Sequence, residues 1–136
     1  MKSMQNPTNA PSIMIVEDDK VACELLATVI RRRFPRITTY LAENGRAGVE
    51  VFKQHSPEIV ITDINMPEMD GIEMAGRIKS LKNDTKLIVI TAYSNPGYVD
   101  KFAQIGVDDY LSKPVEFVKL FQAVEKCIDE IMLERK

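Results

Sequence analysis

The apolar residues of this 136-residue chain fall into short runs separated by longer stretches with helical spacing. Short runs that are rich in β-branched residues and end in turn residues predict buried strands. Such runs lie at 12–16, 37–41, 59–61, 87–90 and 108–111. The stretches between them repeat apolar residues every three or four positions, which is typical of amphipathic helices. Helices are predicted over 20–33, 45–54 and 72–81, after Pro96, and over 115–134.

Strands and helices therefore alternate five times, which predicts a single parallel sheet with helices on both faces. Right-handed crossovers between the strands then give a doubly wound α/β fold. The length suits one domain with a proper core, and we assign residues 12–136 to it. Residues 1–11 are rich in Asn, Pro, Thr and Ser, so we expect a flexible N-terminal tail.

Composition and charge narrow the class of protein. The formal net charge is −2, so the chain lacks the overall basic excess that would predict direct nucleic-acid binding. The one basic run, Arg31 to Arg33 with Arg36, lies where a helix should end, and cations there complement the helix dipole. No apolar stretch approaches the length of a membrane span, and the N-terminus lacks the apolar core of a signal peptide. We expect a cytoplasmic protein in which Cys23 and Cys127 are reduced, half-buried core thiols.

Polar residues follow the predicted strands at their carboxyl ends. Glu17 and Asp18 follow the first strand, and Asp63 follows the third strand, in a loop punctuated by Pro67 and Gly71. The fourth strand ends at Thr91, and the fifth leads to Lys113. In a parallel sheet these ends share one edge, which is where ligands bind. Three carboxylates, a hydroxyl and an ammonium group are therefore predicted to converge.

Three carboxylates held close together repel one another. A hard cation relieves this repulsion, and Mg²⁺ suits a site with few carboxylates and several waters. Together with a lysine and a hydroxyl, such a site could stabilise a transferring phosphoryl group. An aspartate can itself accept that group as an aspartyl phosphate. Asp63, which comes from a central strand, is the best candidate for the acceptor.

With these residues in place, the chain resembles a response-regulator receiver domain, the phosphoacceptor half of two-component signalling, as found in single-domain chemotaxis regulators. The resemblance is carried by four segments in register: IMIVEDD (13–19), IVITDINMPEMDG (59–71), IVITA (88–92) and DDYLSKP (108–114). It implies a five-stranded, flavodoxin-like (βα)5 fold with strand order 2-1-3-4-5.

The resemblance also implies a role for individual residues. Asp63 would be the phosphorylated nucleophile. Asp18 would bind Mg²⁺ directly, Glu17 through a water, and Asn65 through its backbone carbonyl. Lys113 would pair with the phosphoryl group, and the Lys113–Pro114 bond is expected to be cis. Thr91 would donate a hydrogen bond to the phosphoryl group, and Tyr110 would be the ring that changes rotamer. Asp19 lies beside the acidic pair, but capping of the first helix explains it better.

By the same resemblance the chain is a signalling switch that promotes only its own phosphorylation and dephosphorylation. The donor would be a sensor histidine kinase or histidine phosphotransferase, docked near Lys20, Cys23 and the loop after Pro114. Phosphorylation would change the surface formed by the helix after Pro96, the fifth strand and the last helix. A downstream protein or an output domain would read that surface, and a phosphorylation-dependent homodimer is one form the response could take. The chain is expected to be a stand-alone receiver or one cut from a larger regulator.

Two other functions remain open at this stage. A phosphatase of the haloacid dehalogenase type also uses a nucleophilic aspartate and Mg²⁺, but it would need an Asp-x-Asp pair where this chain has Asp63-Ile64-Asn65. A receiver-like scaffold that works without phosphorylation would not need the complete set of acidic residues. The last helix is also open to two interpretations, because its apolar stripe could pack only on the sheet or also form a seam with a dimer partner or another domain.

Overall fold

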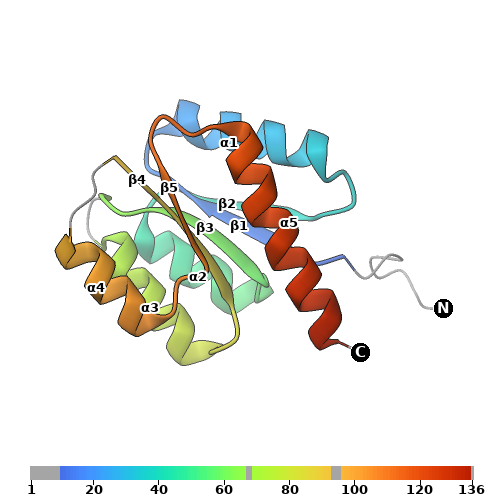
Figure 1. Cartoon of the computed structure of the whole chain (residues 1–136). Helices are drawn as coiled ribbons and strands as arrows, with labels where there is room; N and C mark the ends of the chain where they lie inside the picture. The colour runs from blue at the N-terminus through green and yellow to red at the C-terminus, as the bar shows by residue number, and fades with distance from the viewer. Residues whose placement is uncertain (1–9, 67–68, 93–95, 136) are drawn as a thin grey trace.

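A computed structural model describes residues 10–66, 69–92 and 96–135, and its strands form one parallel sheet (Figure 1). The strands are β1 (Ile13–Val16), β2 (Thr39–Ala42), β3 (Ile59–Asp63), β4 (Lys86–Thr91) and β5 (Asp109–Ser112). The helices are α1 (Lys20–Arg33), α2 (Gly45–His55), α3 (Gly71–Leu81), α4 (Pro96–Ile105) and α5 (Phe117–Glu134). The sheet order is β2-β1-β3-β4-β5. The predicted doubly wound, flavodoxin-like fold is confirmed.

Alternate side chains of each strand point to opposite faces of the sheet, and each face has its own core. Figure 1 shows α1 and α5 on one face, with α2, α3 and α4 on the other. Ile15, Ile61 and Ile88 pack on the first face with side chains of α1 and α5. Val60 and Val89 pack on the second face with residues such as Phe102 of α4. Burial on both faces explains why the central strands read as continuous apolar runs.

Several element boundaries differ by one residue from those predicted, and three differ by two. β2 begins at Thr39 instead of residue 37, because the amide of Ile37 donates to the carbonyl of Phe34 in a turn and does not join the ladder. α5 begins at Phe117, two residues later than predicted, because its first helical hydrogen bond runs from Leu120 to Glu116. β3 extends as far as Asp63, so that this carboxylate belongs to the strand itself.

Polar N-caps fix the first residues of α1, α2 and α3, the helices that follow the loops at the carboxyl edge of the sheet. The side chain of Asp19 accepts a hydrogen bond from Ala22 N, which confirms its predicted capping role in α1. Asn44 and Asp70 cap α2 and α3 in the same way. Each such cap stabilises its helix by about 1 kcal/mol. The last turn of α1 holds Arg31, Arg32 and Arg33, as the helix-dipole interpretation requires.

Cys23 and Cys127 are free thiols, and both are buried more completely than predicted. Burial raises the pKa of Cys127 to about 12 and also raises the pKa of Cys23. A buried thiol with a raised pKa is an unreactive nucleophile, so both side chains act as small apolar residues. Among the described residues, no helix combines the length and the hydropathy that crossing a bilayer requires.

Candidate functional site

The carboxyl edge of the sheet gathers side chains from four strands and the loops that follow them. Glu17 follows β1 and is 4% exposed, and Asp63 ends β3 at 7% exposed. Thr91 ends β4, and Lys113 comes directly after β5. In the pairing of the neighbouring strands β3 and β4, Asp63 lies beside Ile90 of β4. The parallel topology therefore brings together groups that lie far apart in the sequence.

Lys113 forms the main contact with Asp63. Its Nζ lies 2.9 Å from Asp63 Oδ2 and 3.8 Å from Glu17 Oε1. The backbone amide of Lys113 donates to the carbonyl of Thr91 at 2.9 Å, which ties the loop after β5 to the end of β4. The peptide bond between Lys113 and Pro114 is cis, as predicted. Burial alone would lower the pKa of Lys113, but its hydrogen bond to Asp63 and the nearby carboxylates outweigh this and raise it.

Three carboxylates lie around this lysine. Glu17, Asp18 and Asp63 each offer an oxygen, and these oxygens all lie within 4.8 Å of one another. Burial, together with the charge of Asp63, raises the pKa of Glu17 to about 7, although the Asp19 amide donates to its Oε2 at 3.1 Å. Ionising all three groups is therefore unfavourable without a further cation. The donor set consists of hard oxygens, which suits Mg²⁺.

The remaining predicted residues lie on β4, on β5 and in the loop directly after β3. Thr91 is half-buried at the end of β4 and is paired in register with Ser112. Asn65 is exposed in the loop directly after β3. Tyr110 is 37% exposed, and its ring meets Phe102 edge to face with centroids 6.2 Å apart. The structure thus brings Glu17, Asp18, Asp63 and Lys113 together, while the ring of Tyr110 lies at the surface. Pro67, expected to shape the loop, falls outside the described residues.

Gly71 contributes to the site in a way that the sequence did not reveal. Its amide donates to the carbonyl of Ile64 at 2.8 Å, which folds the loop after β3 back onto the start of α3. A Cβ atom at this position would lie 2.2 Å from the carbonyl oxygen of Asp63 and 3.1 Å from Ile64 Cα. Only glycine allows the backbone to approach the end of β3 so closely. An Asp-Gly pair before a helix gives a turn signal, but it does not show which backbone the glycine contacts.

Comparison with known proteins agrees with this geometry. The sequence model of the response regulator receiver domain matches residues 13–125. The chemotaxis protein CheY of Bacillus subtilis is 31% identical over 120 residues, which cover 88% of this chain and 99% of CheY. The probable C4-dicarboxylate response regulator DctR of Priestia megaterium is 33% identical over 115 residues, and the matched part spans 50% of that longer protein.

Solved structures give the same result. The N-terminal domain of an uncharacterized protein from Wolinella succinogenes has a TM-score of 0.85 and 38% identity, covering 93% of this chain and 100% of that one. The signal receiver domain of a signal transduction histidine kinase from Syntrophus aciditrophicus has a TM-score of 0.79 and 29% identity, covering 90% of this chain and 92% of that one. The family match, the fold and the arrangement of the strand ends agree: this chain belongs to the response regulator receiver domain family.

Proposed function

We propose that Asp63 accepts a phosphoryl group from a histidine kinase or histidine phosphotransferase, and that a partner or an output domain reads the result. The observation that carries this proposal is the 2.9 Å contact between Lys113 Nζ and Asp63 Oδ2, within a group of three carboxylates of which Glu17 and Asp63 are buried and Asp18 is exposed. Receiver domains are signalling domains of two-component systems, and a phosphorylation switch is their general role. This family assignment favours a switch over the phosphatase alternative.

The chemistry follows from the groups at the edge of the sheet. A carboxylate oxygen of Asp63 forms a bond to phosphorus while the P–N bond of a phosphohistidine donor breaks, and the electron pair leaves with the imidazole nitrogen. Lys113 neutralises charge on the transferred group, and the hydroxyl of Thr91 donates a hydrogen bond to it. Both act by fixed charge and placed donors, which is the main way in which proteins promote phosphoryl transfer.

The acidic group fits a bound Mg²⁺, whose charge would offset the negative charge that gathers during transfer. Asp18 and Asp63 would bind it directly, Glu17 through a water, and Asn65 through its backbone carbonyl. Two observations support this assignment: the carboxylate oxygens lie within 4.8 Å of one another, and the pKa of Glu17 is raised. In such a group a cation is needed to keep every carboxylate ionised at neutral pH.

The response would pass from Thr91 to Tyr110 and the surface of α4, β5 and α5. Phosphorylation adds negative charge and acceptor oxygens at Asp63. Thr91 would move toward the phosphoryl group, and the Tyr110 ring, which is partly exposed against Phe102, would turn inward. A partner that binds one of the two surfaces more tightly shifts the population toward it. We expect this to take place in the cytoplasm, within a receiver domain of residues 12–136.

Phosphoryl uptake by the purified protein tests this proposal. With a small acyl phosphate and Mg²⁺, intact-mass measurement should show the addition of one phosphoryl group to the whole population or a large part of it. The adduct should disappear at alkaline pH, because an acyl phosphate hydrolyses readily. Inorganic phosphate in place of the acyl phosphate provides the control and should add no mass. An unmodified mass after prolonged incubation would rule out the proposed switch.

Mg²⁺ should stabilise the folded protein, and Asp18→Asn should weaken this effect. A ligand that binds only the folded state adds about 2.7 kcal/mol at a concentration of 100 times Kd. The stabilisation should be larger at pH 8 than at pH 6, because the pKa of Glu17 is raised to about 7 and Mg²⁺ must displace its proton at the lower pH. Thermal melts with and without Mg²⁺, at both values of pH, measure this stabilisation.

Asp84→Asn is the matched control for this experiment. Asp84 is an exposed carboxylate that pairs with Lys82, two residues before the start of β4 and so at the opposite edge of the sheet. Its replacement should leave the Mg²⁺ effect unchanged. If Asp18→Asn and Asp84→Asn respond to Mg²⁺ equally, Asp18 is not a metal ligand.

A further inference from the structure

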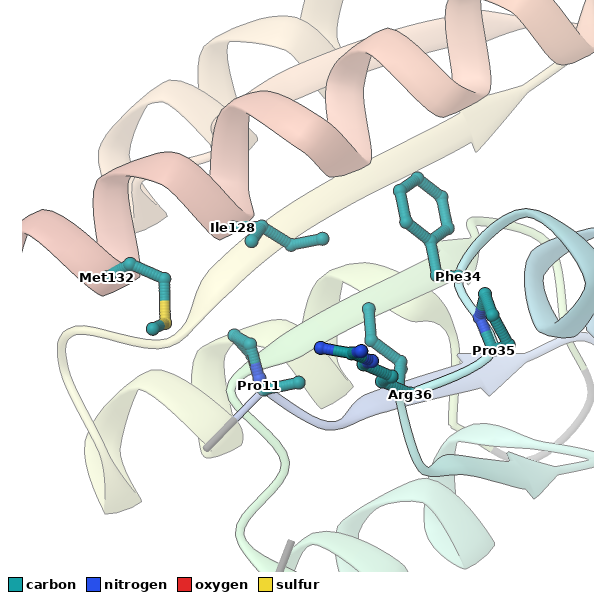
Figure 2. Close-up of a pocket in the computed structure, with 8 residues that line it drawn as sticks. Pro11, Phe34, Pro35, Arg36, Ile128 and Met132 are labelled. Carbon is teal, nitrogen blue, oxygen red and sulfur yellow. The ribbon is translucent and has the colours of Figure 1, made fainter. Parts of the chain in front are cut away.

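The edge of the sheet where the strands begin, opposite to Asp63, holds a cavity of about 350 Å³. Three segments wall it: the residues directly before β1, the turn between α1 and β2, and the last turns of α5. Figure 2 shows Ile128 and Met132 pointing from α5 toward Pro11 and Arg36 across this cavity. None of the described residues that line it belongs to the group around Asp63.

The lining of this cavity is apolar apart from one side chain. Phe34, Ile37 and Met132 contribute to it, and among the eight described residues that line it only Arg36 carries a charge. Small-molecule sites in proteins have this composition, with apolar walls, few polar groups and a volume of roughly 300–1,000 Å³. The cavity therefore has the lining of a site for a small ligand, and its size lies at the lower end of that range.

The turn between α1 and β2 forms a fixed wall. The amide of Phe34 donates to the carbonyl of Ile30 at 2.8 Å, and the amide of Ile37 donates to the carbonyl of Phe34 at 3.0 Å. The ring of Phe34 also meets the ring of Phe121 on α5 edge to face, with centroids 6.0 Å apart. These contacts hold the turn against α5 on one side of the cavity.

The other two walls share an anchor at the start of β3. The amide and the hydroxyl of Ser12 donate to Oε1 of Glu58, at 2.7 and 3.0 Å. Arg135, which follows α5, pairs with the same carboxylate, and its Nη1 lies 3.8 Å from Met132 Sδ. The protein's own contacts thus hold these walls in place, so a ligand that binds here needs to order little of the protein.

Positive charge gathers beside the cavity. Arg36 lines it and is exposed to water, and the basic run Arg31–Arg33 ends directly before Phe34. The guanidinium carbon of Arg33 lies 4.9 Å from the centre of the Phe34 ring. Glu125 of α5 pairs with Arg33, which offsets its charge, and no described residue that lines the cavity is acidic. An apolar cavity with a cation at its rim is complementary to a molecule that has an apolar body and a negative head group.

We propose that this cavity binds a small amphiphilic carboxylate, whose apolar body packs against Phe34 and Met132 and whose carboxylate pairs with Arg36. Removal of apolar surface from water provides most of the affinity. A guanidinium binds a carboxylate through two parallel N–H···O bonds, and its five donors allow it to do so while it keeps a contact with the protein. Arg36 therefore selects the charge of the ligand, and the apolar walls select its size.

Ligand binding at this cavity does not depend on phosphoryl transfer, because the two sites lie at opposite edges of the sheet and share no residue. The uptake of a phosphoryl group from a small donor and the binding of a carboxylate can therefore fail separately. The cavity also lies at the end of α1, away from Lys20 and Cys23, where we expect the phosphoryl donor to dock.

Isothermal titration calorimetry of the full chain tests this inference with three probes that share one apolar chain: octanoate, octanol and protonated octylamine. Octanoate should bind at one site with a Kd below about 1 mM. Octanol should bind about fivefold more weakly, because an exposed ion pair contributes only modestly. Octylamine should bind more weakly than octanol, because its charge repels Arg36.

Arg36→Gln should make octanoate bind as weakly as octanol, and it should leave the affinity for octanol unchanged. Arg32→Gln is the matched control, because Arg32 is an exposed arginine of the same basic run that does not line the cavity. This control variant should keep the full preference for octanoate over octanol.

Met132→Trp should abolish the binding of both octanoate and octanol, because the larger indole fills the cavity. Leu133→Trp is the matched control. Leu133 is the next residue of α5, is 69% exposed and does not line the cavity, so both probes should bind as they do to wild type. Circular dichroism and thermal melts confirm that each variant is folded.

Absence of saturable octanoate binding would overturn the proposal, and a protein segment, from this chain or from a second copy, would then be the occupant of the cavity. Equal affinities of wild type for octanoate and octanol would also overturn it, as would octanoate binding by Met132→Trp at the affinity of wild type. An equal loss of affinity in Arg32→Gln and Arg36→Gln would show that the basic run attracts the probe without a defined site, which likewise contradicts the proposal.

Discussion

Asp63→Asn is expected to abolish phosphoryl uptake completely in the intact-mass measurement. The amide that replaces the carboxylate carries no negative charge and is a poor nucleophile toward phosphorus. The surrounding geometry should persist, because an asparagine oxygen can still accept the hydrogen bond that Ile64 N donates to Asp63 Oδ1 at 2.7 Å. The variant therefore removes the acceptor with little change in shape.

The same substitution should not destabilise the metal-free protein. It removes the 2.9 Å ion pair with Lys113, but it also removes one of three carboxylates that repel one another. The charge of Asp63 contributes to the raised pKa of Glu17, so Glu17 should ionise more easily in the variant. We expect a melting temperature in EDTA equal to or above that of wild type, and a weaker response to Mg²⁺ because one ligand is lost.

Asp70→Asn provides a matched control for Asp63→Asn. Asp70 caps α3 through a 2.9 Å hydrogen bond from Glu73 N, and asparagine is an equally good N-cap residue. This control variant should take up a phosphoryl group as wild type does, and its stability should equal that of wild type. Retained uptake by Asp63→Asn, with the adduct on the same peptide, would show that another side chain is the acceptor.

Gly71→Ala is expected to destabilise the fold and to slow phosphoryl uptake together. The new Cβ would lie 2.2 Å from the carbonyl oxygen of Asp63, and the atoms it meets belong to the backbone, which cannot swing aside. Overpacking of this kind costs about 1–3 kcal/mol, and more where the backbone resists. The relief of the clash must move either the start of α3 or the strand that carries Asp63. Denaturant unfolding gives the loss of stability, and the rate of mass gain with an acyl phosphate gives the effect on the site.

Gly76→Ala, on the same helix, should have the opposite effect on stability. Apart from its chain neighbours and the nearby backbone of its own helix, no atom lies within 4 Å of the position its Cβ would take, so the methyl group meets open space. Alanine in a helix interior is more favourable than glycine by about 1 kcal/mol. Gly76→Ala should therefore stabilise the protein and leave phosphoryl uptake unchanged. If both variants shifted stability in the same direction, close approach of Gly71 to the end of β3 would not explain its presence.

The pattern of apolar residues was enough to predict the order of the elements and the fold. Each buried strand reads as a run that is too short for a helix, and the alternation of strands with helices leaves few topologies open. The errors lie at the boundaries of the elements. The apolar pattern predicts the start of β2 two residues early, because Ile37 is apolar and buried but lies in a turn. Periodicity reports burial, and it does not show which amides enter the ladder.

The candidate site was predictable for the same reason. Parallel strands place their carboxyl ends along one edge, so Glu17, Asp63 and Lys113 had to converge once the fold was known. The roles of Thr91 and Tyr110 stay predictions, because they depend on a change between two states. The close contact of Gly71 was not predictable, since it depends on how α3 docks against the end of β3.

The sequence by itself thus determined the fold and the set of chemical groups at the carboxyl edge of the sheet, because both follow from local periodicity and from the rules of parallel sheets. Only the tertiary structure decided the distances within that set, such as the contact between Lys113 and Asp63, and the fit of Gly71 against the end of β3. It also decided which side of α5 remains exposed beside α1. Helical spacing identifies an apolar stripe, but whether a neighbouring helix covers that stripe depends on packing between segments that lie far apart in the chain.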